Sequence, residues 1–91
     1  MPAGTLQLAW MNKGADSAER YHIMYGIDGQ NRTMRARNVE GRASLTELLA
    51  NDLALLPDRI NRIMDDLQKT GTCSVAGLNV AESDLKRLDL A

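Results

Sequence analysis

The sequence predicts one small α+β domain over residues 1–91, with an antiparallel sheet first and helices after it. Two observations predict this class. Three segments within residues 5–39 read as half-buried strands, in which apolar and polar positions alternate with a period of two. From residue 44 onward, apolar residues recur at helical spacing instead. The expected order is β-β-β-α-α-(β)-α, a three-stranded meander with one face covered by two to three helices and the other face open.

Three segments are expected to form the meander: 5–11, 21–27 and 32–39. In the first, Leu6, Leu8 and Trp10 share one face. In the second, Ile23 and Tyr25 lie on the face that the helices would cover, and His22 and Met24 lie on the other. A polar connection, 12–20, joins these two strands, and the turn-forming residues 28–31 precede the third strand.

The pattern also predicts a register for the third strand. Tyr25 is expected opposite Met34, and Ile23 opposite Ala36. This register places Arg35 and Arg37 on the open face, whereas a slip of one residue would turn both toward the core.

The first helix is expected to begin at Ser44, because Ser44 and Glu47 have the spacing of a capping box. Its apolar stripe comprises Leu45, Leu48, Leu49, Leu53 and Leu56. Pro57 ends or kinks this helix and suits the first position of the next one.

In the second helix, one buried face is expected from Ile60, Ile63, Met64 and Leu67, and Gly71 stands where a left-handed C-terminal cap belongs. Residues 72–76 predict a short fourth strand that extends the sheet. Residues 82–90 predict a last helical turn or two.

The composition favours a soluble, cytoplasmic protein. The chain is 44% hydrophobic and 25% charged, as in ordinary globular domains. Its single cysteine, Cys73, excludes an intramolecular disulfide and a cysteine-based zinc site. We expect no metal, no cofactor and no membrane segment. The net charge of −1 argues against a general polyanion binder.

Two residues could carry catalysis, and both have simpler interpretations. His22 is the only histidine and has no sequence-local partner, so we expect a solvent-facing strand residue. Cys73 has no electropositive neighbours in sequence, so we expect it to pack as a small apolar residue. An enzyme is therefore not expected.

The candidate binding residues centre on the open face of the sheet. Arg35, Arg37 and His22 are expected on that face, with further cations at strand ends and in adjoining loops: Lys13, Arg20, Arg32 and Arg42. Arginine and methionine are enriched at protein interfaces, which favours a non-enzymatic protein-interaction or regulatory module, including a homodimer. The alternative is sequence-tolerant DNA binding through the same arginines, since an exposed sheet can enter the major groove. The opposing interpretation is that the charges only keep exposed strands apart.

Overall fold

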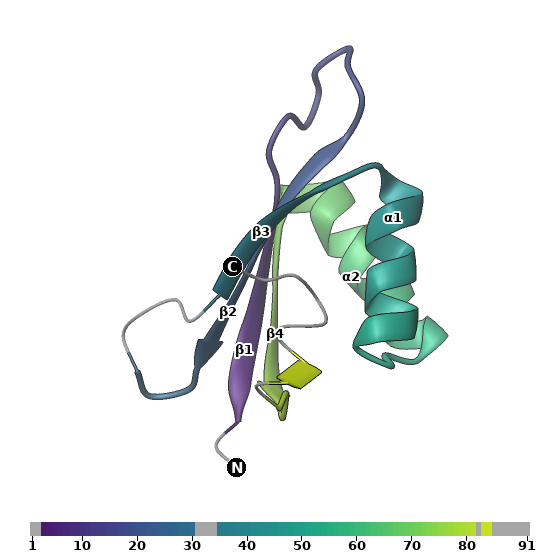
Figure 1. Cartoon of the computed structure of the whole chain (residues 1–91). Coiled ribbons are helices and arrows are strands. Elements are labelled where there is room, and N and C mark those ends of the chain that lie inside the picture. The colour runs from purple at the N-terminus through teal and green to yellow at the C-terminus, as the bar shows by residue number, and fades with distance from the viewer. Residues whose placement is uncertain (1–2, 31–34, 82, 85–91) are drawn as a thin grey trace.

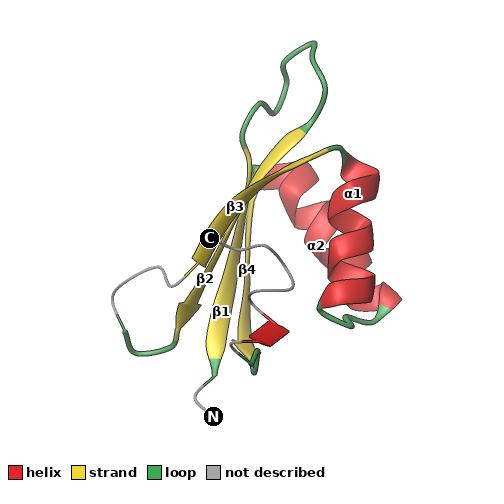
Figure 2. Ribbon diagram, in the orientation of Figure 1, coloured by secondary structure: helices red, strands yellow, loops and turns green. Residues whose placement is uncertain are grey.

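The computed structural model describes residues 3–30, 35–81 and 83–84, and only the backbone of Arg35. It is an α+β fold of two layers. A four-stranded antiparallel sheet forms one layer, and the helices lie together on one side of it (Figure 1; Figure 2). The elements are β1 (Gly4–Trp10), β2 (Arg20–Ile27), β3 (Arg35–Glu40), α1 (Arg42–Glu47), the π-helical turn η1 (Leu48–Asp52), α2 (Pro57–Thr70) and β4 (Thr72–Leu78).

The strand order is β3-β2-β1-β4, so the expected meander gains a fourth strand beside β1. The predicted strand near residues 72–76 is confirmed as β4 and extends to Leu78. Of the predicted final helix over 82–90, the structure describes only residues 83 and 84, which are helical, and the rest lies outside the described residues.

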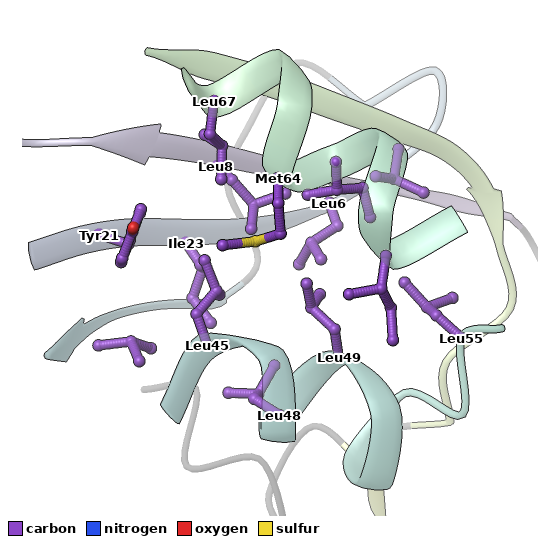
Figure 3. Close-up of a cluster of buried hydrophobic side chains, with 14 of the residues drawn as sticks. Leu6, Leu8, Tyr21, Ile23, Leu45, Leu48, Leu49, Leu55, Met64 and Leu67 are labelled. Atoms are coloured by element: carbon purple, nitrogen blue, oxygen red, sulfur yellow. The ribbon is translucent and has the colours of Figure 1, made fainter. Parts of the chain in front are cut away.

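The core lies between the sheet and the helices and is almost entirely aliphatic. The expected inward faces of β1 and β2 are confirmed: Leu6, Leu8, Ile23 and Tyr25 are all buried. Figure 3 shows leucines of α1 and η1, together with Met64 and Leu67 of α2, pointing into the space above the sheet. Burial of this shared face is what holds the two layers together.

The register predicted for β3 is wrong by one residue. In the structure Ile23 pairs with Arg37, Met24 with Ala36, and Tyr25 with Arg35. Arg37 therefore lies on the side of the sheet that carries the helices, and Ala36 on the other side. This slip is tolerated because β3 is an edge strand, where a long side chain can carry its charge past the apolar core.

The start of the first helix also differs from the prediction. The helix begins at Arg42, with Gly41 as its N-cap at φ +91°, and no side chain caps it. Ser44 therefore lies inside the first turn, and the capping box does not form. After Glu47 the backbone widens into the π-helical turn η1, which still buries Leu48 and Leu49.

The apolar stripe ends before Leu56, whose side chain is 73% exposed. Ala54 adopts a left-handed φ of +54°, and Leu56 is extended as the N-cap of α2. This tight reversal turns Leu56 away from the core. Helix α2 agrees with the prediction: Pro57 opens it, Gly71 caps it at φ +82°, and its four predicted residues are buried.

Candidate functional site: the open face of the sheet

The side of the sheet opposite the described helices is the candidate site, and we call it the open face. Strand alternation places twelve residues there. Arg20 and Glu40 lie at one end, and the other ten form the centre: Thr5, Gln7, Ala9, His22, Met24, Gly26, Ala36, Asn38, Thr72 and Ser74. All are half-buried or exposed. None of the described helices covers them (Figure 2).

Two rows of side chains run across the four strands. The first row contains Asn38, His22, Ala9 and Thr72 in neighbouring positions. The Nδ1 atom of His22 lies 2.7 Å from the Oδ1 atom of Asn38. A contact with an accepting oxygen requires hydrogen on Nδ1, so the neutral ring presents Nε2 as an acceptor.

The second row contains Ala36, Met24, Gln7 and Ser74. Each row places a long side chain beside a short one: His22 lies next to Ala9, and Met24 next to Ala36. The centre of the open face therefore presents methyl, thioether, amide, imidazole and hydroxyl groups at differing heights.

Among the described residues, the ten central positions of the open face contain no lysine, arginine, aspartate or glutamate. Charges appear at one end of it, where Arg20 pairs with Glu40 across β2 and β3, and both side chains are exposed. Solvated sheet faces usually carry charged residues among the polar ones. An uncharged centre with a charged margin is instead typical of an interface.

Arg37 lies away from the open face. It is half-buried and lines a cleft of about 280 Å³ on the helix side, together with Ser44, Glu47, Leu48, Asn51 and Asp52. The polar side chains of α1 and η1 give the guanidinium a hydrophilic surrounding beside the core. This explains how an arginine occupies the inward register position opposite Ile23 without burying its charge.

The other predicted cations are dispersed. Arg35 pairs with the inward-facing Tyr25, and its side chain, like all of Arg32, lies outside the described residues. The Lys13 side chain lies against Gly71, at the start of β4. Arg42 opens α1, on the helix side. Of the predicted set, the structure places His22 on the open face and Arg20 at its end.

The connection between β1 and β2 is organised by Asn12. Its amide nitrogen donates to Ser17 Oγ at 2.9 Å and to the Ala18 carbonyl at 2.6 Å, and its Oδ1 accepts from the Arg20 amide at 2.8 Å. This loop extends past the end of the sheet (Figure 1). Its shape therefore depends on one side chain.

Cys73 and His22 do not come together, because Cys73 pairs with Leu8 and faces the helices. Burial raises the pKa of the Cys73 thiol, and the nearby Asp66 carboxylate, at 3.7 Å, raises that pKa further. A raised pKa keeps the sulfur in its less nucleophilic form. This geometry offers no activated cysteine.

Sequence reasoning placed His22 and Met24 on the open face but missed Ala36 and Asn38. They were hidden by the register error, which exchanged them with their arginine neighbours. Thr72 and Ser74 were missed for another reason, since the predicted fourth strand had no assigned pairing. Their alternation with Cys73 and Val75 was the available signal.

Comparisons with known proteins add no relative: no family model, curated protein or solved structure matches the chain. None of the helices in the described part of the chain is long and apolar enough to cross a membrane. Residues 3–30, 35–81 and 83–84 contain no group of three or more His, Cys, Asp or Glu residues that could hold a metal ion.

Proposed function

We propose that this chain is a non-enzymatic interaction module that docks a protein partner on the open face, and that the partner is a second copy of the chain. The observation that carries the proposal is the uncharged centre of that face. Two copies of a charged face would meet with like charges opposed, whereas two copies of this face meet without that penalty.

The row pattern supports a two-fold arrangement. A two-fold axis parallel to the strands, between β1 and β2, lays β2 of one copy over β1 of the other. His22 then faces Ala9 of the second copy, and Met24 faces Gln7. Each long side chain meets a shorter or flexible one, which is how packed sheets interdigitate.

The size of the face sets the expected affinity. Ten positions, each about 4.8 Å by about 7 Å, give roughly 340 Å² per copy. This is less than half the area of a standard stable interface, which places the contact among weak, transient ones. We expect a dissociation constant in the high micromolar range.

The DNA-binding alternative depended on arginine side chains projecting from the open face. Arg37 lies on the opposite side of β3, and no cation stands among the ten central residues of the face. Protein association is therefore the better supported function.

Sedimentation velocity from about 10 µM to 1 mM tests the proposal, because that range spans the affinities of weak interfaces. The informative variant is Gln7→Glu, which introduces a carboxylate at the centre of the face. The matched control is Gln68→Glu, the same substitution at an exposed position of α2. Wild type and the control are expected to dimerise equally, and Gln7→Glu to weaken the dimer about tenfold.

Three outcomes would overturn the proposal. One is a wild-type protein that stays monomeric over the whole range. Another is equal weakening by the two substitutions, which would place the contact elsewhere. The third is tight binding of duplex DNA with a steep salt dependence and no dimer, which would favour the alternative.

A further inference from the structure

Strand β4 forms one edge of the described sheet and lacks two common protections against pairing with another strand. Thr72–Leu78 contains no charge and no proline. Its register with β1 shifts by one residue between the pairs Leu6–Val75 and Gly4–Leu78, so the regular part of the edge is 72–75. The opposite edge, β3, contains Arg35, Arg37 and Glu40. Uncharged edge strands are templates for strand addition from another chain.

The hydrogen-bond pattern between β1 and β4 identifies which backbone groups point outward. The Trp10 amide donates to the Gly71 carbonyl at 2.7 Å, so these two residues form a hydrogen-bonded pair. Antiparallel pairs alternate between bonded and non-bonded. The backbone groups of Thr72 and Ser74 therefore point away from β1. The shift in register interrupts the alternation after Val75, and beyond it the Ala76 carbonyl accepts a hydrogen bond from α2 and so faces outward as well.

Two side chains of α2 occupy these outward groups. The Thr72 amide donates to Thr70 Oγ1 at 3.3 Å, and that hydroxyl lies 2.9 Å from the Thr72 carbonyl. At the other end, Arg59 Nη2 donates to the Ala76 carbonyl at 3.3 Å. The Thr70 hydroxyl has a single hydrogen, which the carbonyls of Thr72 and Asp66 share. The hydroxyl oxygen accepts the hydrogen bond from the Thr72 amide whichever carbonyl that hydrogen faces.

We infer that Arg59 and Thr70 are edge caps that close β4 to strand addition from a second copy of the chain. An incoming strand would need the outward groups of Thr72, Ser74 and Ala76 in succession. With the caps in place, Ser74 alone offers both its amide and its carbonyl. Removing the caps exposes a continuous uncharged edge, and antiparallel pairing of two β4 strands follows.

The experiment combines decapping with a disulfide trap. In a Cys73→Ala background, Ser74→Cys supplies one thiol at the centre of the edge. Two β4 strands paired about residue 74 place their Cα atoms about 5.5 Å apart, within the range a disulfide spans. The decapped protein carries Arg59→Ala and Thr70→Val in addition.

Oxidation should link the decapped protein into dimers about tenfold faster than the capped one, as expected for the loss of two hydrogen bonds. The matched control carries Arg62→Ala and Thr46→Val, which remove the same groups from positions that do not contact β4. It should behave as the capped protein does. Thermal melting of each variant monitors folding, and Arg59→Ala alone, an exposed substitution, provides a second decapped protein.

Equal cross-linking rates for capped and decapped proteins would overturn the inference, as would an equal gain in the control. The trap also separates this inference from the proposed function. In the face-to-face dimer β4 lies over β3 of the other copy, so the two residues at position 74 stay far apart. Loss of that dimer leaves the cross-linking comparison unaffected.

Discussion

Gly4 stands where the Tyr25 ring crosses β1, and replacing it with alanine should be strongly destabilising. A Cβ atom at Gly4 would lie 2.2 Å from Tyr25 Oη, 2.3 Å from Cζ and 2.7 Å from the Gly26 carbonyl. Tyr25 is 1% exposed and cannot swing into solvent. The ring must therefore shift by roughly 1 Å to restore an ordinary contact of about 3.5 Å.

The cost has two parts. Overpacking a core position of this kind costs about 1–3 kcal/mol. The shift also strains the hydrogen bond that Tyr25 Oη donates to the Leu78 carbonyl at 3.2 Å, which contributes about 1 kcal/mol. Alanine loses less backbone conformational entropy on folding than glycine does, which offsets about 0.5 kcal/mol of this cost. The net loss is about 1.5–3.5 kcal/mol, or a fall in Tm of about 6–28 °C for a domain of this size.

Urea and thermal unfolding followed by circular dichroism measure this change. The control is Gly14→Ala, where φ is +83° and no atom lies within 4 Å of the new Cβ, so only the backbone conformation is penalised, by about 1 kcal/mol. Adding Tyr25→Phe to Gly4→Ala removes the nearest contact and should recover about 1 kcal/mol as a coupling energy. A Gly4→Ala protein within 0.5 kcal/mol (about the error of such cycles) of wild type would refute the reasoning.

Four further outcomes are expected. Ala36→Lys should cost no more than about 0.5 kcal/mol in urea unfolding, because position 36 lies on the open face, and a loss above about 2 kcal/mol would restore the register predicted from sequence. Asp66→Asn should speed the alkylation of Cys73 and shift the pH dependence of that reaction to lower pH, because the carboxylate that raises the thiol pKa is gone. An unchanged pH dependence would contradict this. Asn12→Ala removes three loop hydrogen bonds and should cost about 1–3 kcal/mol while making the loop sensitive to limited proteolysis, unlike Asn61→Ala on α2. Burial, and next the Glu19 carboxylate that accepts the hydrogen bond of the Tyr21 hydroxyl, raise the pKa of Tyr21 above 10.0. The contribution of the phenol to stability is therefore present below about pH 10 and is lost as the pH rises further. Unfolding measured against pH should show this alkaline loss in wild type and a smaller one in Tyr21→Phe.

Sequence periodicity was sufficient for the elements whose buried faces are complete. Leu6 and Leu8 alternate strictly because β1 is a central strand, and Ile60 to Leu67 keep helical spacing because α2 packs along its whole length. The same rule failed at β3, where half of the strand lies beyond the core and an inward arginine reaches polar neighbours. It failed again at Leu56, because burial there depends on the backbone reversal at Ala54, which no apolar pattern encodes.

The candidate site changed for the same reason. A one-residue slip moved Arg37 to the helix side and brought Ala36 and Asn38 to the open face. A shift of one residue moves every side chain of a strand to the opposite face of the sheet. The length of the turn before β3 therefore decides which residues of β3 lie on the open face. The sequence after β2 begins with the turn-forming residues 28–31, whose composition allows loops of either parity. The sequence therefore placed the candidate surface on the side of the sheet opposite the helices but assigned it a basic character that the described residues at its centre do not have.

The uncharged centre of the open face and the capped edge support one account of how this chain associates. A sheet can bind another chain through an edge or through a face. Here the β3 edge contains charged residues and the β4 edge is capped by Arg59 and Thr70, while the helices fill one face. Among the described residues, the centre of the open face is the sheet surface without charge, cap or cover. Pairing of two β4 edges and packing of two open faces are both two-fold contacts that stop at two copies. The caps therefore do not set the number of copies, and in the proposed account they leave the open face as the surface on which two copies meet.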